Sequence, residues 1–308
     1  MRTAKVTMIR VERFNQTHLS QLQALINAHL QTVVPGWSLP EEYIASRIES
    51  NPFEHICDPW VVERETLCAL KRERVCAAGH LLRYGDDPEV GEGCRNVAEM
   101  NWFLAWPQDA DAGHALLQAA CERMDRWKPS QQWGGVTLPV PCCAGIADAW
   151  PHIATMLETV GFMHEGHIES VYAGRLDGVV GPGDSPVGGV SLRREACDRG
   201  VSFTAYEGDR RVGHCQCAAD LTLGGRLLAL RNWAELADML VTSEYRSRGI
   251  GSWLVRHAAQ WLRLAGCDRI VIAVAADDEA AGAGRFYQRF GWHSITRLRR
   301  GWQRTVVA

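Results

Sequence analysis

The stretch of sequence that decides the fold is LADMLVTSEYRSRGIGSWLV, residues 236–255. It predicts a strand, then a turn over RSRGIG, then an amphipathic helix. Glycines in such a turn allow consecutive backbone N–H groups to point into one concavity, where the helix N-terminus favours an anion. Arg246 and Arg248 add positive charge. The stretch therefore predicts either a site for a phosphate-bearing ligand, such as a pyrophosphate, or a tight strand-to-helix connection without a ligand.

A second copy of this pattern lies earlier in the chain. The segments VAEMNWFLAWP (residues 97–107) and WAELADMLVTS (residues 233–243) share an Ala-Glu pair followed by an apolar run. Their glutamates, Glu99 and Glu235, are 136 residues apart, and the same offset aligns the starts of two helical patterns of similar length. The sequence therefore predicts a duplicated fold.

Two further matches support the duplication. MLETVGF (residues 156–162) parallels FYQRFGW (residues 286–292) at an offset of 130, and a Gly-His pair recurs at 79–80 and 213–214. The same kinds of element thus follow one another in the same order in both halves.

The chain length also fits two domains. With 308 residues, the protein is about twice the most common domain size. The segment DGVVGPGDSPVGG, residues 177–189, holds five glycines and two prolines and predicts a linker. We therefore expect domains at residues 1–176 and 190–308.

Each half reads as α/β. Strands are predicted at residues 61–70, 75–83, 136–140, 201–206, 227–230 and 269–275. The first half also opens with a strand at 7–13, a helix capped by Thr17 and a second helix near 41–48. The second half has too little chain before residue 201 for two such helices.

Composition excludes several classes of protein. Lys and Arg number 33 and Asp and Glu 36, a formal charge of -3, and no long basic block is present, so nucleic acid and anionic membrane are poor candidates as partners. No apolar run approaches the roughly 20 residues that span a bilayer, and the first residues lack an apolar signal core, so we expect a cytoplasmic protein. The 11 cysteines form no CxxC pair, which favours reduced thiols and no metal site.

Two motifs carry a family resemblance. YRSRGIG resembles the R-x-x-G-x-G/A signature of the GNAT superfamily of N-acetyltransferases, and AGRFYQRFGW, residues 283–292, is similar to its second signature, A-x-x-L/F-Y-x-x-x-G-F. The matching residues are Arg246, Gly249 and Gly251 in the first, and Ala283, Phe286, Tyr287 and Gly291 in the second, where Trp292 replaces the Phe. The resemblance covers the chain from Ser191 onward, and the first half through the repeat.

The resemblance implies two tandem GNAT-like domains, each a mixed, largely antiparallel twisted sheet flanked by helices. It implies acetyl-CoA as the acetyl donor, with its pantetheine arm beside Met239, Leu240 and Val241 and with Phe286 at the cofactor. The pyrophosphate would lie on the turn Arg246, Ser247, Arg248, Gly249, Ile250, Gly251 and Ser252. An asparagine that the family often carries is here Ala280.

Direct acyl transfer to an amine needs a base, an oxyanion donor and an acid. By resemblance, Glu235 is the expected base and Asp238 its rival, although the period of two puts them on opposite faces of a strand unless a bulge intervenes. Either could instead be a solvated or salt-bridged carboxylate. Tyr287 matches the family's general acid, and a backbone N–H near Leu240 or Val241 would polarise the thioester.

The first half departs from these motifs. In the repeat, Arg246 becomes Ala110, Gly251 becomes Ala115 and Tyr287 becomes Leu157, while Asp109 and Asp111 lie in the turn. Gly113 is retained. We expect this half not to bind acetyl-CoA productively, and to wall the acceptor site instead.

The predicted function is acetyl-CoA-dependent N-acetylation of a primary amine of a small molecule, such as an antibiotic or a polyamine-like acceptor. Two alternatives are a non-catalytic acyl-CoA-binding or scaffold protein and a protein N-acetyltransferase. The expected state is a monomer or homodimer.

Overall fold

A computed structural model describes residues 8–50, 56–135, 137–138, 140, 143–197 and 200–306. The chain divides into two compact units, Met1–Ile168 with Thr296–Ala308, and Glu169–Ile295. This division differs from the expected boundaries at 176/177 and 189/190. Residues 177–189 pack within the second unit, where Val179 and Val187 are buried in its core.

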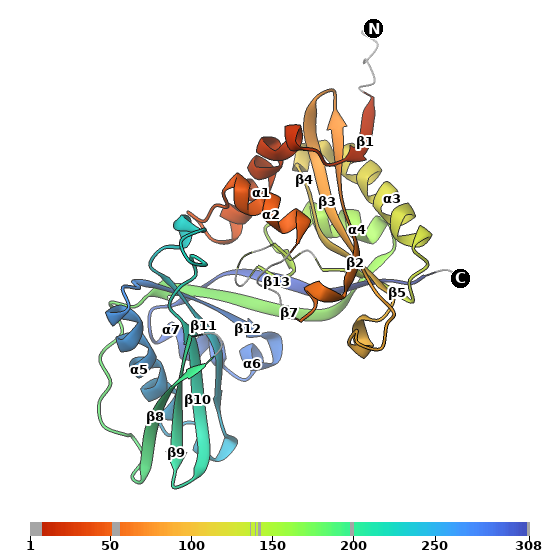
Figure 1. Ribbon diagram of the computed structural model, residues 1–308. Coiled ribbons are helices and arrows are strands. Elements are labelled where there is room, and N and C mark those ends of the chain that lie inside the picture. Colours follow the sequence, from red (N-terminus) through yellow and green to blue (C-terminus); the bar gives the residue numbers. More distant parts are fainter. Residues whose placement is uncertain are drawn as a thin grey trace. The chain divides into compact units, whose positions relative to one another are not determined.

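The first unit is a sheet with helices on both faces (Figure 1). Its strands are β1 Ile9–Arg13, β2 Val61–Lys71, β3 Arg74–Tyr84, β4 Val97–Ala105, β5 Gln131–Gly134 and β6 Ile146–Ala147, and its helices are α1 Leu19–Val33, α2 Glu41–Glu49, α3 Ala110–Arg126 and α4 Pro151–Thr159. Strands β1 to β4 are antiparallel, and β4 and β5 are parallel. Helices α1 and α2 lie on one side of β2–β4 and α3 on the other.

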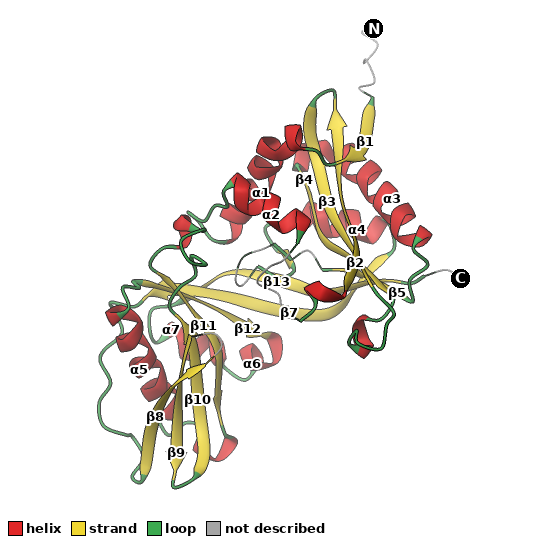
Figure 2. Cartoon of the chain, viewed as in Figure 1, coloured by secondary structure: helices red, strands yellow, loops and turns green. Residues whose placement is uncertain are grey.

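The second unit repeats this plan without the first two helices. It contains β8 Val190–Cys197, β9 Gly200–Glu207, β10 Arg210–Ala218, β11 Trp233–Val241, α5 Ile250–Leu264, β12 Arg269–Ala275, α6 Ala276–Ala280 and α7 Ala283–Gln288. Figure 2 shows α5 beside the strands, and it packs on β9, β10 and β11. Because β8 follows the 177–189 segment directly, the expectation that no helix pair opens this half is confirmed for the described residues.

Two long strands complete the sheets. Strand β7, Phe162–Arg175, follows α4 of the first half, but from Glu169 onward it pairs with β12 of the second unit. Strand β13, His293–Arg304, follows α7 of the second half, but its end pairs with β5 and β6 of the first unit. Each unit thus receives its last strand from the other half, which is why the units do not coincide with the expected domain boundaries.

Most expected strands are present, and three differ. β5 ends at Gly134, ahead of the strand expected at 136–140, where residues 136 and 139 lie outside the described residues. The run at 227–230 contains the 3-10 turn Leu228–Leu230, and the strand begins only at Trp233. A short apolar run does not by itself distinguish a strand from a turn, and here only Leu227 and Leu230 are buried. β1 begins at Ile9, and Thr7, the expected start, is outside the described residues.

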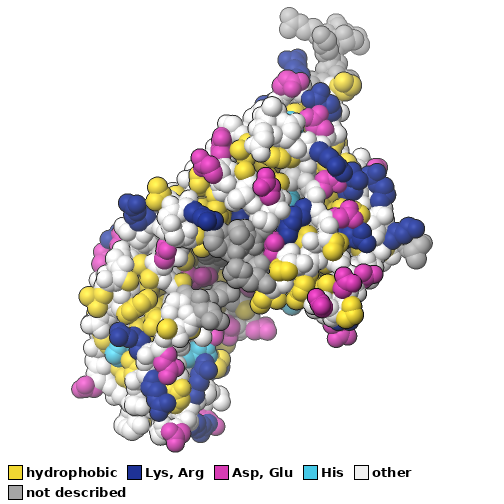
Figure 3. All heavy atoms as spheres, viewed as in Figure 1, with side chains coloured by type: hydrophobic (Ala, Val, Ile, Leu, Met, Phe, Trp, Pro, Cys, Tyr) yellow, Lys and Arg dark blue, Asp and Glu magenta, His cyan; other side chains and the backbone are white. Residues whose placement is uncertain are grey.

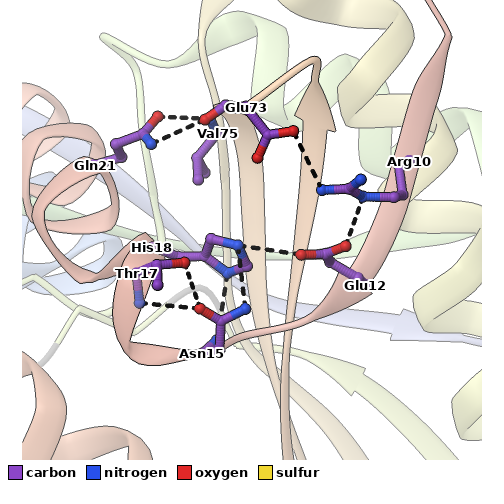
Figure 4. Close-up of polar contacts among 8 residues, drawn as sticks. All are labelled: Arg10, Glu12, Asn15, Thr17, His18, Gln21, Glu73 and Val75. Atoms are coloured by element: carbon purple, nitrogen blue, oxygen red, sulfur yellow. Dashed lines mark hydrogen bonds and ion pairs between the residues drawn. The ribbon is translucent and has the colours of Figure 1, made fainter.

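The cap of the first helical segment is Asn15 rather than Thr17 (Figure 4). Asn15 Oδ1 accepts hydrogen bonds from the backbone N–H and the hydroxyl of Thr17. His18, at the third position of the 3-10 turn Gln16–His18, lies 3.2 Å from Glu12 on β1. A short polar network therefore joins the first strand to the start of α1.

The duplication is visible in the backbone. Residues with a left-handed backbone conformation (positive φ) recur at the same offset of 136. One pair is Arg72 (φ 58) and Gly208 (φ 60), and another is Asn96 (φ 51) and Asn232 (φ 67). Both halves also carry a bulge at the same point of the strand pair before the helix. Between β3 and β4, the pair His80↔Trp102 is followed by Leu81↔Met100. Between β10 and β11, the pair Gln216↔Asp238 is followed by Cys217↔Leu236. The counterpart of His80 is therefore Gln216, and the expected alignment of the two Gly-His pairs is wrong.

Candidate active site

The candidate site lies in the second unit, where two parallel strands separate. β11 and β12 pair over only three positions, from Trp233↔Arg269 to Glu235↔Val271. Beyond Glu235, a cavity of about 560 Å³ opens between the two strands. It is lined by β11, by the turn that follows β11, by β12 and by the α6–α7 segment.

A bulge in β11 decides which side chains reach this cavity. Ala237 is the extra residue, since Leu236 pairs with Cys217 and Asp238 pairs with the neighbouring Gln216. One extra residue returns Asp238 to the face of Glu235. The expectation that the period of two separates the two carboxylates is therefore wrong here, and the bulge is the reason.

The two carboxylates differ in their surroundings. Asp238 lines the cavity and its side chain is 55% exposed. Glu235 is half-buried and is not among the described residues that line the cavity. Of the two candidate bases, Asp238 is the one in contact with the open space between the strands.

Asp238 has a partner that the sequence motifs did not reveal. His214 on β10 is buried, and its Nε2 lies 2.6 Å from Asp238 Oδ2. Strand alternation places His214 on the same face of β10 as Gln216, but only the pairing of β10 with β11 shows that Gln216 lies opposite Asp238.

Tyr287, the expected acid, lines the same cavity from α7. Its hydroxyl is 3.8 Å from Met239 Sδ, and its ring stacks on Trp292 with centroids 5.8 Å apart. Burial raises the pKa of Tyr287 above its ordinary value, and nearby Cys215, Asp278 and Asp238 act in the same direction. The phenol therefore keeps its proton at neutral pH.

The turn between β11 and α5 has the geometry of an anion cradle. Ser247 and Gly249 are left-handed, with φ 58 and 89, and α5 begins at Ile250. The backbone N–H of Trp253 donates to Gly249 O at the start of α5. The N–H groups of residues 250–252 come before this bond and have no acceptor within the helix, so they are available to a ligand. Arg246 Nε donates to Val241 O at 3.0 Å, which ties the turn to the end of the strand.

The second glycine of the motif gives room for close packing. A Cβ at Gly251 would lie 3.0 Å from Met239 Cε and 3.4 Å from the Phe286 ring. The start of α5, the end of β11 and α7 therefore meet at Gly251. The cofactor-binding residues expected from the motifs, from Met239 to Ser252 together with Phe286, come together around this cavity; only Arg248 and Ile250 are not in its lining.

The equivalent turn of the first unit is closed. α3 begins at Ala110, the counterpart of Arg246, so the residues that form the cradle in the second unit are helical here. Asp109 is buried and lies 2.9 Å from Lys71 Nζ and 2.6 Å from Arg74. Although burial opposes it, hydrogen bonds from Lys71 and Arg74 lower the pKa of Asp109. Asp109 is thus the N-cap residue of α3 with its carboxylate held by Lys71 and Arg74 rather than by the helix N–H groups, and Leu157 replaces the tyrosine.

Three properties of the described residues relate to the composition of the sequence: the surface charge, the potential metal ligands and the helix hydropathy. Acidic and basic side chains are interspersed on the face drawn in Figure 3. No group of three or more potential metal ligands is found in the described part of the chain. No helix there is long and apolar enough to cross a membrane.

The splayed strands, the glycine turn and the helix after it are features of a GNAT-type fold. Residues 181–292 match the Acetyltransferase (GNAT) family model. The match is confined to these residues of the second unit, and the chain as a whole has the tandem GNAT fold.

Three similar proteins support these statements. A tandem GNAT protein from the clavulanic acid biosynthesis pathway matches with a TM-score of 0.64 and 15% identity over 98% of this chain and 99% of its own. A GCN5-related N-acetyltransferase from Sphaerobacter thermophilus matches with a TM-score of 0.61 and 16% identity over 96% and 95%. N-alpha-acetyltransferase 30 of Schizosaccharomyces pombe is 32% identical over 99 residues, which are 32% of this chain and 61% of that protein. The chain thus spans less than two thirds of this curated relative.

Proposed function

We propose that the second unit transfers an acetyl group from acetyl-CoA to a primary amine of a small molecule. The observation that carries this proposal is that one cavity is lined by the Asp238 carboxylate, the Tyr287 hydroxyl and the glycine turn. A carboxylate can accept a proton, a phenol can donate one, and a helix N-terminus can hold a phosphate. The cavity thus offers a base and an acid for acyl transfer to an amine, together with a site for the phosphates of the acyl donor.

Acetyl-CoA supplies the activated acetyl group as a thioester. The turn 246–252 would hold its pyrophosphate through backbone N–H groups and the positive charge of its arginines. Met239, Leu240 and Val241 would flank the pantetheine arm, and a backbone N–H there would polarise the thioester carbonyl. Phe286 lies beside Gly251, where it would pack against the cofactor.

Asp238 is the general base of this proposal, in preference to Glu235. The acceptor ammonium gives a proton to the Asp238 carboxylate, and the free amine nitrogen then forms a bond to the acetyl carbonyl carbon. The carbon–sulfur bond breaks as the nitrogen gives its second proton to solvent, and the Tyr287 hydroxyl gives its proton to the departing thiolate. Solvent returns a proton to Tyr287 and takes the one held by Asp238.

The first unit binds no acetyl-CoA in this account. The turn equivalent to 246–252 is helical from Ala110 onward, so the open glycine cradle is absent there. A phosphate at this helix start would also lie close to the buried Asp109 carboxylate, which repels an anion. This supports one cofactor site per chain.

A thiol-release assay tests the proposal. Acetyl-CoA is incubated with the full chain and, in turn, spermidine, glucosamine, kanamycin and a peptide with a free N-terminal methionine. We expect turnover with at least one small amine, and a loss of about 10²- to 10⁴-fold in kcat for Tyr287→Phe with acetyl-CoA still bound.

Two results would replace the proposal by its alternatives. Acetyl-CoA binding without turnover of any amine would favour a non-catalytic acyl-CoA-binding protein. Turnover of the peptide alone would favour protein N-acetylation, the activity named in the S. pombe relative.

A further inference from the structure

We propose that His214 is a positioning residue, which holds one oxygen of Asp238 so that the other faces the acceptor amine. This inference rests on the proposed role of Asp238 as base. It starts from the short contact between His214 Nε2 and Asp238 Oδ2, 2.6 Å long, which joins the neighbouring strands β10 and β11.

The contact depends on the bulge. In the ladder, His214 lies opposite Leu240, and Asp238 lies opposite Gln216, so the two side chains are diagonal neighbours on one face. Without the extra residue Ala237, Asp238 would point to the face that packs on α5. The same irregularity that brings Asp238 to the cavity therefore brings it to His214.

The two partners differ sharply in exposure. The His214 side chain is 7% exposed, and that of Asp238 is 55% exposed. A buried ring between strands has few alternative rotamers, whereas an exposed aspartate has several. The histidine is therefore the fixed partner and the aspartate the one whose conformation is selected.

The proton of this hydrogen bond is on the histidine. An ionised carboxylate can only accept, so His214 Nε2 must carry the hydrogen. His214 Nδ1 is buried and has no hydrogen-bond partner among the described residues. His214 thus has no nitrogen facing the amine, which makes it unsuited to act as the base itself.

This arrangement leaves Asp238 Oδ1 for the acceptor. Oδ2 is held by His214, and no partner of Oδ1 is found among the described residues. A displacement of about 1 Å of a catalytic group can cost about 10²-fold in rate. Holding Oδ2 therefore has a measurable effect on kcat even though His214 touches no reacting atom.

The first unit, which lacks the glycine cradle, also lacks the histidine–aspartate pair. At the offset of 136, the counterparts of His214 and Asp238 are Ala78 and Trp102. Trp102 stacks on His80, with ring centroids 5.7 Å apart. The histidine–aspartate pair therefore occurs only in the half that keeps the glycine turn and the tyrosine.

The test compares three variants of the full chain, using the amine of the panel above that turns over fastest. His214→Met removes the donor, and we expect kcat to fall about 10- to 100-fold with the dissociation constant of acetyl-CoA unchanged. His214→Gln keeps a donor close to the Nε2 position, and we expect it to restore kcat to within a few-fold of wild type. His214→Met combined with Asp238→Asn should be no slower than Asp238→Asn alone, because both act through one carboxylate.

The outcomes separate this inference from the proposed function. If Asp238→Asn keeps wild-type kcat, the proposed base is wrong and the inference with it. If Asp238→Asn is impaired but His214→Met is not, or if the two losses multiply, only the role of His214 is overturned. Thermal melting and acetyl-CoA calorimetry on each variant exclude misfolding as the cause of a loss.

A second measurement needs no acceptor. In protein labelled with ¹⁵N-histidine, the Nε2–H of His214 should give a low-field proton signal that is absent in His214→Met and displaced in Asp238→Asn. Absence of this signal in the wild-type protein would overturn the inference even if no amine of the panel were acetylated.

Discussion

Asp238 and Glu235 lie on the same face of β11, but only Asp238 lines the cavity between the separated strands. At the scale of single residues, this difference predicts unequal effects of two isosteric variants. Asp238→Asn should lower kcat by about 10²- to 10⁴-fold, because it removes the proton acceptor and keeps the shape. Glu235→Gln is the matched control and should stay within about tenfold. Steady-state kinetics checks both, and a larger loss in Glu235→Gln would return the role of base to Glu235.

The sequence could name both carboxylates but could not choose between them. Their positions follow from motif resemblance, whereas the bulge at Ala237 arises from pairing with β10, which no local pattern encodes. His214 was missed for the same reason, because its partner is 24 residues away along the chain. Tyr287 was found because a contiguous motif carries it.

At the scale of elements, the close contact of α5, β11 and α7 at Gly251 predicts that a single methyl group disturbs the cofactor site. In Gly251→Ala, the added Cβ would lie 3.0 Å from Met239 Cε, so the helix start or the strand must shift. We expect the dissociation constant of acetyl-CoA to rise about tenfold or more, on the scale of 1–3 kcal/mol for overpacking.

The control for this variant is Gly178→Ala, since a Cβ at Gly178 has open space around it. Calorimetric titration with acetyl-CoA compares the two. Equal affinities in both variants would show that the cofactor does not depend on the packing at Gly251.

Elements with a strong local signal could be predicted from the sequence, and elements defined by pairing could not. The glycine turn and α5 follow the pattern of residues 236–255 closely. The exchanged ends of β7 and β13 could not be predicted, because the partner of a strand is chosen by long-range packing. The two Gly-His pairs were aligned wrongly for the same reason, because the strand pairing was not known from the sequence. The bulges in β4 and β11 give the correct alignment, in which His80 corresponds to Gln216.

At the scale of the molecule, two buried histidines of the first unit predict how stability depends on pH. Burial lowers the pKa of His29 to about 4 and that of His80 to about 3, whereas both are near 6.5 when exposed. Between about pH 4 and 6.5 the unfolded chain therefore binds more protons than the folded one. The free energy of unfolding should fall as pH decreases through this window, by about 1.4 kcal/mol per pH unit for each histidine.

Urea unfolding followed by tryptophan fluorescence at pH 7.5 and 5 measures this difference. Replacing His80 by Leu should reduce the slope with pH, because it removes one of the histidines whose pKa burial lowers. Equal unfolding free energies at the two pH values would contradict the buried, neutral state of these histidines.

The two halves share a backbone plan but differ at the helix that follows the fourth strand of each plan. α5 begins after an open glycine turn, whereas α3 begins at Ala110 with Asp109 held by Lys71 and Arg74. We therefore propose one acetyl-CoA site in a chain with two similar folds, located at the glycine turn before α5.

The most direct test is calorimetric titration of acetyl-CoA into the full chain and into two glutamate variants. Gly249→Glu and Gly266→Glu add the same charge at residues with the same left-handed φ of 89, at opposite ends of α5. We predict one site per chain in the wild-type protein and in Gly266→Glu, and no binding in Gly249→Glu. Two sites per chain, or undiminished binding in Gly249→Glu, would contradict the account.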